Sequence, residues 1–234
     1  MLPLVIGHRG VKEFAPENSI SAIYMANKLK IRSIEIDVQL SKDNRPIVFH
    51  DETLDRCTGF PGYVKDFTYN ELLKHNISLS HIFTKEKIPS LKQFVKLCDR
   101  FDIYLNIEIK ECDNKLTPNI VCNEIKKIGN PKNIVISSFN AQYLETAMYI
   151  LPEYERMYIV EKIPDNFLNI LNKYKCKGLV ISLQHNSLHE IIDLSIFPIN
   201  IYVYTVNDKE TYNILIKHGI GVITDYPYSF QKYT

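Results

Sequence analysis

Two acidic residues interrupt an apolar run near the start of the chain. In the segment SIEIDV, Glu35 and Asp37 alternate with isoleucine and valine, a composition typical of a buried strand. An unpaired charge in such a place is costly, so both carboxylates need partners. Side chains two positions apart point to the same face of a strand, which places Glu35 and Asp37 side by side.

A predicted hairpin brings a histidine to the same face. Residues 42–45, Lys-Asp-Asn-Arg, are typical of a two-residue turn, because aspartate and asparagine tolerate the backbone angles that such a turn needs. In this register Asp37 lies opposite His50, and Val48 shares their face. A slip of one residue would turn His50 to the other face.

Polar residues also follow or interrupt two other apolar runs. His8 and Arg9 come directly after LVIG, while Glu108 and Lys110 share one face of LNIEIK. In a barrel of parallel strands, the carboxyl ends of the strands meet at one face. We therefore expect these four side chains to lie beside Glu35.

This set of residues has the parts of a site that cleaves a phosphodiester. Three carboxylates at one place cannot all stay ionised unless a cation compensates them. Oxygen ligands suit Mg2+ or Ca2+, with Mn2+ as a third candidate. Two histidines that titrate near neutral pH supply a general acid and a general base, and arginine and lysine suit an anionic oxygen. The alternative is a group of ordinary salt bridges on a polar rim.

The elements that must position these residues alternate along most of the chain. Eight predicted strands, separated by helical patterns, span residues 4–8, 34–38, 103–110, 133–138, 156–160, 178–182, 200–206 and 221–225. This alternation predicts a parallel sheet covered by helices. Eight units in 234 residues favour an α/β fold of the (β/α)8 TIM barrel type over an open doubly wound sheet.

Residues 51–89 break the alternation. They follow the predicted hairpin of the second strand and contain one short helical pattern. We interpret them as a small insertion in a single domain that spans residues 1–234. A loop of this length is commonly a lid or a pocket wall; the alternative is a structural plug beside the barrel mouth.

Composition excludes several classes of partner. The formal net charge is +1 and no long run of lysine or arginine occurs, so binding to nucleic acid or to an anionic membrane is not predicted. No segment approaches the ~18–20 apolar residues of a membrane span, and the first residues do not form a typical signal peptide. Five scattered cysteines without a C-x-x-C pair predict reduced thiols and a cytoplasmic protein. The sequence indicates no oligomeric state.

Several motifs, taken together, resemble those of the glycerophosphodiester phosphodiesterase family. They are HRG at 8–10, PEN at 16–18, EIDVQLSKDNRPIVFHDETLDR at 35–56, IPSL at 88–91 and LNIEIK at 105–110, followed by SSF, YTVN and ITDYP. The resemblance covers nearly the whole chain in order. It implies a barrel with a small insertion after the His-Asp pair, and it implies hydrolysis of glycerophosphodiesters to sn-glycerol 3-phosphate and an alcohol.

The resemblance also implies a role for each residue of the predicted site. The implied metal ligands are Glu35, Asp37 and Glu108, the catalytic residues are His8 and His50, and the phosphate contacts are Arg9 and Lys110. On the implied route, the glycerol hydroxyl next to the phosphate attacks it, and water opens the cyclic intermediate. The two histidines exchange acid and base roles between the steps.

Three further residues lie at the ends of later strands. Phe139 and Tyr204 are predicted to line the substrate pocket, although aromatic residues at such positions often serve packing alone; Tyr204 stands where the family usually has tryptophan. Asp225, in ITDYP, ends the last predicted strand and could reach the site, but a turn or cap role is favoured for it.

Two other functions stay open at this stage. A lysophospholipase D-type enzyme of the same superfamily should show an apolar groove for an acyl chain, bordered by the insertion. A non-catalytic glycerophosphodiester-binding protein would not need two histidines that titrate near neutral pH.

Overall fold

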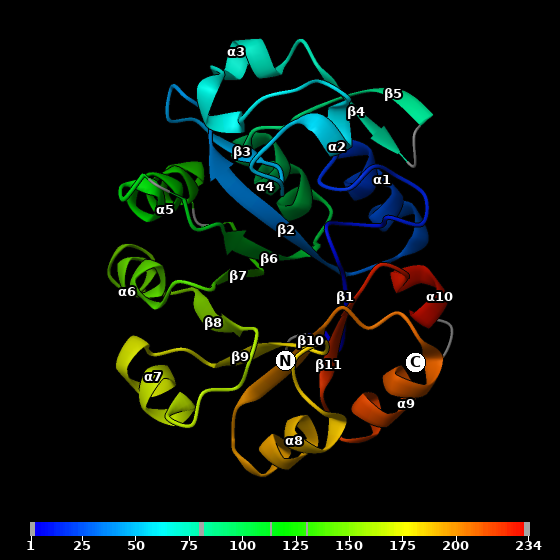
Figure 1. Cartoon of the computed structure of the whole chain (residues 1–234), viewed down its shortest axis with the longest axis vertical. Coiled ribbons are helices and arrows are strands. Elements are labelled where there is room, and N and C mark those ends of the chain that lie inside the picture. Colours follow the sequence, from blue (N-terminus) through cyan, green and yellow to red (C-terminus); the bar gives the residue numbers. More distant parts are fainter. Residues whose placement is uncertain (1–2, 80–81, 113, 130, 232–234) are drawn as a thin grey trace.

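Eight parallel strands close into a barrel in the computed structural model, which describes residues 3–79, 82–112, 114–129 and 131–231 (Figure 1). The strands are β1 (Val5–Gly7), β2 (Ser33–Leu40), β6 (Tyr104–Ile109), β7 (Ile134–Ser138), β8 (Glu155–Val160), β9 (Gly178–Ser182), β10 (Asn200–Tyr204) and β11 (Gly221–Thr224). Each strand pairs with the next one named, and β11 pairs with β1 to close the barrel. The prediction of a TIM barrel is confirmed.

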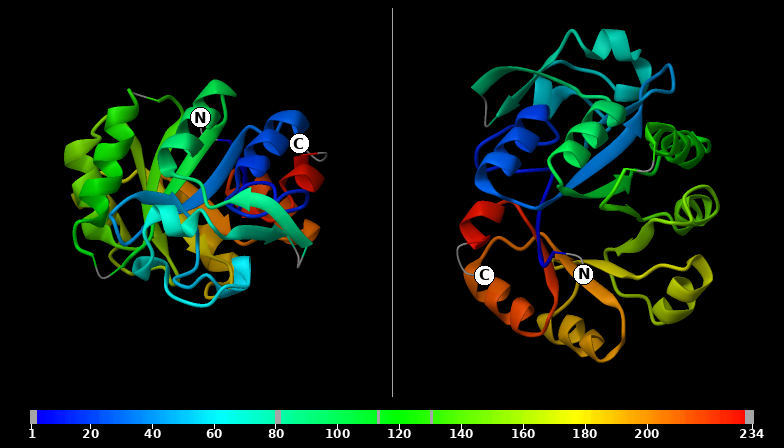
Figure 2. Two further views of the ribbon diagram at one scale, coloured as in Figure 1. Left: turned by 90° about the horizontal axis from the view of Figure 1, so that it is seen from above. Right: turned by 180° about the vertical axis from the view of Figure 1, so that it is seen from behind.

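Helices surround the barrel on its outside (Figures 1 and 2). They are α1 (Ile20–Leu29), α4 (Leu91–Arg100), α5 (Thr117–Ile128), α6 (Ala141–Ile150), α7 (Phe167–Tyr174), α8 (Leu188–Asp193) followed by the 3-10 turn η2 (Leu194–Ile196), α9 (Lys209–Lys217) and α10 (Pro227–Gln231). Side-chain caps fix where several begin: Ser19 accepts from the Ala22 N–H in α1, and Ser90 forms a capping box with Gln93 in α4. None of the described helices combines the length and the apolar character needed to cross a membrane.

Two apolar layers hold the barrel together. Because alternate strand residues face opposite sides, Ile107 joins the outer core beneath the helices, whereas Asn106 and Glu108 face inward. The inner core consists of Ile6, Val135, Met157, Ile159, Val180, Tyr202 and Ile223. This core fills the barrel below its mouth, so the polar residues at the carboxyl ends of the strands gather in the mouth itself.

The insertion covers one side of that mouth (Figure 1). It contains α2 (Asp55–Thr58), the 3-10 turn η1 (Val64–Asp66), α3 (Tyr69–Leu72) and an antiparallel hairpin of β4 (Asn76–Leu79) with β5 (Ile82–Lys87). The hairpin and two of the three short helical turns were not predicted. The insertion has a hydrophobic cluster of its own, built on Ile47 and Phe49 from the chain that enters it and on Leu54, Val64 and Leu72 within it.

The hairpin between β2 and β3 (Pro46–Val48) has a register that differs by one residue from the predicted one. Val38 pairs with Val48, and the Phe49 N–H donates to the Asp37 carbonyl (3.0 Å), so Phe49 rather than His50 lies opposite Asp37. Val48 packs into the outer core instead of sharing the Asp37 face. The predicted pairing of Asp37 with His50 is therefore wrong.

The cause of the shift is one extra residue in the turn. Asn44 takes a left-handed conformation with φ of 57°, and the Ser41 N–H donates to the Arg45 carbonyl at 3.1 Å. This gives a three-residue loop that ends in a left-handed residue, which is the commonest form after two-residue turns. Asparagine tolerates positive φ better than most residues do.

Candidate active site

Three carboxylates from two neighbouring strands converge in the barrel mouth. Asp37 on β2 and Glu108 on β6 are directly paired in the parallel register, and Glu35 lies two residues before Asp37 on the same face. One oxygen from each of the three lies within 4.8 Å of the others. Glu35 and Asp37 are almost fully buried, with 4% and 2% of their surfaces exposed.

A tight turn after β1 holds this cluster from one side. Gly7 is required there, because a Cβ atom would lie 2.2 Å from the Gly10 carbonyl oxygen. Arg9 adopts a positive φ of 57°, which is uncommon for a residue other than glycine. Its backbone N–H donates to Glu35 Oε2 at 2.9 Å. The turn thus orients Glu35 and places the side chains of His8 and Arg9 at the mouth.

Two cationic side chains pair with the cluster within the described part of the chain. The Arg9 Nε atom lies 3.5 Å from Asp37 Oδ2, and the Lys110 Nζ atom lies 3.0 Å from Glu108 Oε1 and 3.9 Å from Asp37 Oδ1. Burial alone would lower the pKa of Lys110, but the two carboxylates outweigh burial and raise it. At Arg9, too, the neighbouring carboxylates outweigh burial and raise the pKa, so both side chains stay charged beside the cluster.

The cluster fits a divalent cation. Burial, together with repulsion from Asp37 and Glu108, raises the pKa of Glu35 well above its usual range. Burial and Asp37 likewise raise the pKa of Glu108 to about 7. The three carboxylates outnumber the two cations that pair with them, and one of those cations, Arg9, also pairs with Glu17 at 2.9 Å. The Asn106 side-chain oxygen has no hydrogen-bond partner among the described residues. An all-oxygen set of this kind suits Mg2+, Ca2+ or Mn2+.

His50 reaches the cluster even though the hairpin register differs. β3 ends at Val48, and the Gln39 side-chain amide donates to the carbonyls of Phe49 (2.9 Å) and Asp51 (2.8 Å). These bonds turn the chain so that His50 Nε2 lies 4.0 Å from Asp37 Oδ1, while His50 Nδ1 contacts Asp51 Oδ1 at 2.7 Å. Burial, aided by nearby cations, lowers the pKa of His50. Its Nδ1–H donates to Asp51, which leaves Nε2 as the ring nitrogen that faces Asp37.

His8, which follows β1, has a similar carboxylate partner. Its Nδ1 lies 2.8 Å from Asp225 Oδ1, and that carboxylate also contacts Lys12 Nζ at 2.8 Å. Burial would raise the pKa of Asp225, but the contacts with His8 and Lys12 lower it far below its usual range. From the sequence a turn or cap role is favoured for Asp225, with contact with the site as the alternative, and the structure shows that contact. Closure of the barrel could have predicted this contact, because it places the end of β11 beside the end of β1.

Arg56, Glu17 and Asp51 form a further group of charged residues beside the carboxylate cluster, and the sequence predicted no role for them. Arg56 donates to both oxygens of Asp51 and to both oxygens of Glu17 at 2.7–2.9 Å. Glu17 also accepts from Arg9 at 2.9 Å. The resulting chain of ion pairs joins the carboxylate that orients His50 to the arginine of the β1 turn.

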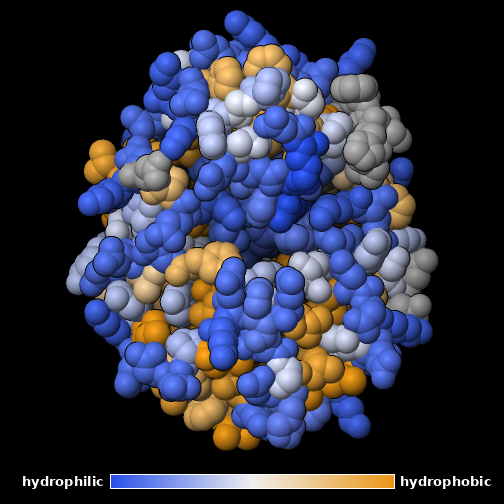
Figure 3. Space-filling view, viewed as in Figure 1, coloured by the Kyte–Doolittle hydropathy of each residue, from blue (hydrophilic) through white to orange (hydrophobic). Residues whose placement is uncertain are grey.

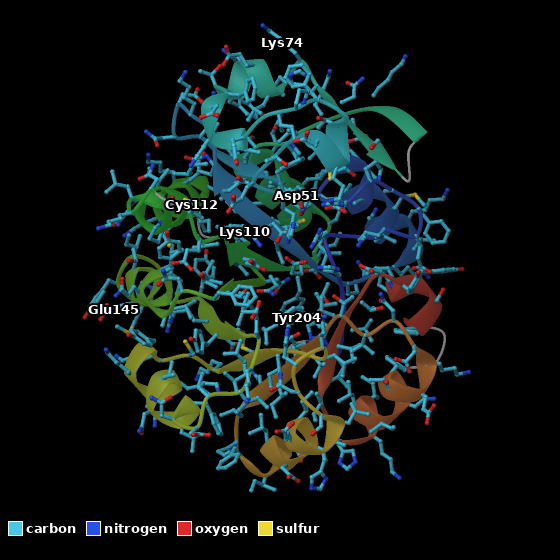
Figure 4. The ribbon with its side chains drawn as sticks, viewed as in Figure 1. Asp51, Lys74, Lys110, Cys112, Glu145 and Tyr204 are labelled. Carbon is cyan, nitrogen blue, oxygen red and sulfur yellow. The ribbon has the colours of Figure 1, made fainter. Side chains whose placement is uncertain are left out.

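The predicted pocket residues complete a cavity of about 340 Å3, here called the site cavity. Phe139 and Tyr204 meet edge to face with ring centres 6.3 Å apart, above the inner core. All nine residues predicted for the site line this cavity, namely His8, Arg9, Glu35, Asp37, His50, Glu108, Lys110, Phe139 and Tyr204. Figure 3 shows a hydrophilic hollow at the mouth, and in Figure 4 Lys110 and Tyr204 lie on opposite sides of it.

The contact between His8 and Asp225 leads to a testable prediction. Asp225→Asn is expected to lower kcat by about 10–10³-fold, because an amide no longer holds the imidazole in one tautomer. Steady-state kinetics, with thermal unfolding as the check on folding, would measure the effect. Asp193→Asn, at an exposed helix end outside the mouth, is the matched control. An unchanged kcat for Asp225→Asn would show that His8 does not depend on this carboxylate.

Comparison with known proteins agrees with the geometry. A sequence model of the Glycerophosphoryl diester phosphodiesterase family matches residues 8–229. The chain belongs to this family. It is accordingly a phosphoric diester hydrolase, and the residues predicted for its site lie within the matched region.

Individual relatives match over nearly their whole length. A glycerophosphodiester phosphodiesterase from Caldanaerobacter subterraneus subsp. tengcongensis is 35% identical over 249 residues, with 97% of this chain and 96% of that protein covered. The structure of a phosphodiesterase from Oleispira antarctica in complex with the product sn-glycerol-3-phosphate matches with a TM-score of 0.90 and 29% identity. The aligned region covers 99% of this chain and 96% of the Oleispira antarctica chain. A Thermotoga maritima family member has a TM-score of 0.80 at 28% identity, with coverage of 100% and 99%.

Proposed function

We propose that this enzyme hydrolyses glycerophosphodiesters to sn-glycerol 3-phosphate and an alcohol, with His8 and His50 as its general acid and base. The observation that carries the proposal is the site cavity, where three carboxylates, two cations and two oriented imidazoles face one space. The product complex of the Oleispira antarctica relative supports the choice of substrate. Glu35, Asp37 and Glu108 would hold the divalent cation.

The cationic groups at the site cavity support an anionic substrate such as a phosphodiester. Arg9 and Lys110 line the cavity beside the carboxylate cluster that would hold the divalent cation. When bound, the cation acts as a Lewis acid that lowers the pKa of the substrate hydroxyl and stabilises charge on the phosphate. Arg9 and Lys110 orient the phosphate, with arginine able to contact two oxygens at once.

The two histidines move the protons. In the first step the glycerol hydroxyl beside the phosphate attacks phosphorus, the bond to the alcohol breaks, and a cyclic glycerophosphate forms. One histidine takes the hydroxyl proton at Nε2, and the other donates its Nε2 proton to the departing alcohol oxygen. In the second step water attacks phosphorus, the roles reverse, and the ring opens to glycerol 3-phosphate. Asp51 and Asp225 hold each imidazole so that Nε2 faces the substrate.

A substrate and metal panel tests this proposal. Release of glycerol 3-phosphate from glycerophosphocholine is expected to fall to background in EDTA and to return when one of Mg2+, Ca2+ or Mn2+ is restored, because the carboxylate cluster lacks a compensating charge without it. A coupled assay for glycerol 3-phosphate measures the rate. Tight binding by calorimetry without turnover under every metal would instead favour a non-catalytic binding protein.

The lysophospholipase D alternative is not favoured by the structure. The cavity that borders the insertion is lined mainly by polar and charged side chains, among them Lys42, Glu52, Lys65 and Glu111, rather than by an apolar groove. Equal or faster release of product from lysophosphatidylcholine than from glycerophosphocholine would reverse this preference.

A further inference from the structure

A second cavity meets the site cavity at a shared wall. It has a volume of about 330 Å3 and lies between the insertion and the segment that follows β6; we call it the outer cavity. Of the described residues, His50 and Lys110 are the two that line both cavities. In Figure 4 Lys110 lies between Tyr204, which lines the site cavity, and Cys112, which lines the outer cavity.

The shared wall consists of the residues that would contact a phosphate ester. A phosphodiester has two ester arms on one phosphorus, so a phosphate held at His50 and Lys110 directs one arm into each cavity. The arm that carries the attacking hydroxyl must lie in the site cavity, because the carboxylate cluster, His8 and the Phe139 ring are there. The second arm is then left to the outer cavity.

We propose that the outer cavity binds the leaving alcohol, and that the insertion selects the head group through Glu52, Tyr63 and Lys65. This inference rests on the proposed hydrolysis of glycerophosphodiesters. The volume lies at the lower end of the ~300–1,000 Å3 that small-molecule sites occupy, which suits a small alcohol.

The wall chemistry defines the class of head group. Side chains of both charges line the cavity, and the Tyr63 ring, 49% exposed, presents its face with the Lys65 ammonium 5.7 Å from the ring centre. The carboxylates of Glu52 and Glu111 suit the ammonium group of an amino alcohol, and the amide and hydroxyl groups of the lining suit hydroxyls. Polar head groups with amino or hydroxyl functions therefore fit this cavity.

Backbone hydrogen bonds link the insertion side of the outer cavity to the segment that carries His50 and Asp51. Thr53 pairs with Tyr63 in a short antiparallel bridge, and the Val64 N–H donates to the Glu52 carbonyl at 2.8 Å. Val64 is anchored in the hydrophobic cluster of the insertion. Glu52 follows Asp51, the partner of His50, so the selecting side chains have a fixed position relative to the proton-transfer group.

The test compares substrates that differ only in the alcohol. Tyr63→Ala and the near-isosteric Glu52→Gln are assayed against glycerophosphocholine, glycerophosphoethanolamine and glycerophosphoglycerol. We expect kcat/KM to change by about 3–10-fold for some alcohols and little for others, as loss of a single contact implies. The inhibition constant of glycerol 3-phosphate should stay unchanged, because this product occupies the site cavity alone. Tyr149→Ala, at a tyrosine on α6 that is 75% exposed, is the matched control.

The outcomes separate this inference from the proposed function. Equal changes for all three substrates, no change for any, or weaker inhibition by glycerol 3-phosphate would overturn the assignment of the outer cavity. Glu52 is exposed, so the Glu52→Gln variant keeps the test valid if Tyr63→Ala fails to fold. If the wild-type enzyme released no glycerol 3-phosphate from any of the three diesters, the proposed function itself would fail.

Discussion

Replacing His50 by alanine is expected to lower kcat by about 10²–10⁴-fold, the usual contribution of a positioned acid or base. The imidazole is held by Asp51 on one nitrogen and presents the other to the cavity, 4.0 Å from Asp37. His8→Ala should have an effect of similar size, since each step of the proposed reaction needs both residues. Release of glycerol 3-phosphate under single-turnover conditions measures the chemical step.

A double variant tests whether His8 and His50 act together in the same reaction. Residues that act as a unit are far from additive, so His8→Ala combined with His50→Ala should be little slower than either single variant. His189→Ala, at a side chain that is 87% exposed on α8, is the matched control. His50 follows the end of β3 and keeps 31% of its side chain exposed, so the melting temperature should change little. Full turnover by either folded single variant would contradict the catalytic roles.

The convergence of the carboxylates could be predicted because it depends on local rules. The pleat puts Glu35 and Asp37 on one face, and a parallel neighbour in register brings Glu108 beside them. The alternation of strands and helices was equally readable, although strand ends shifted by one or two residues: the predicted strand 34–38 is β2, Ser33–Leu40. These features need no knowledge of which distant side chains meet.

The hairpin register and the ion-pair partners depend on information that the sequence does not display. A three-residue turn has one more residue than a two-residue turn, and here the last loop residue, Asn44, is left-handed. This extra residue shifts the register of the returning strand by one position, which moves every later side chain of that strand to the other face. His50 still reaches the site because the Gln39 amide holds the chain on both sides of it. The choice of Asp225 as the partner of His8, 217 positions away, follows from barrel closure.

Glu35→Gln is expected to abolish metal-dependent activity while leaving the metal-free protein as stable as the wild type or more so. The glutamine oxygen can still accept the bond from the Arg9 N–H, but the charge that Asp37 and Glu108 repel is gone. In the wild type, a cation at 100 times its dissociation constant should stabilise the fold by about 2.7 kcal/mol. That corresponds to a rise in Tm of roughly 5–10 °C for a chain of this size.

If Glu35→Gln loses activity but is at least as stable as the wild type without metal, Glu35 acts as a metal ligand. A carboxylate needed only for folding would instead lower the stability of the metal-free protein when replaced. Scanning calorimetry in EDTA and with each cation restored should show the metal-induced rise in Tm for the wild type and its loss in Glu35→Gln. Glu153→Gln, at an exposed residue just before β8 and hence at the end of the barrel opposite the mouth, is the matched control and should keep the full rise. A Glu35→Gln protein that is destabilised in EDTA, yet still stabilised by the cation, would place the ion elsewhere. The three carboxylates of the wild type would then be held together by Arg9 and Lys110, without a cation between them.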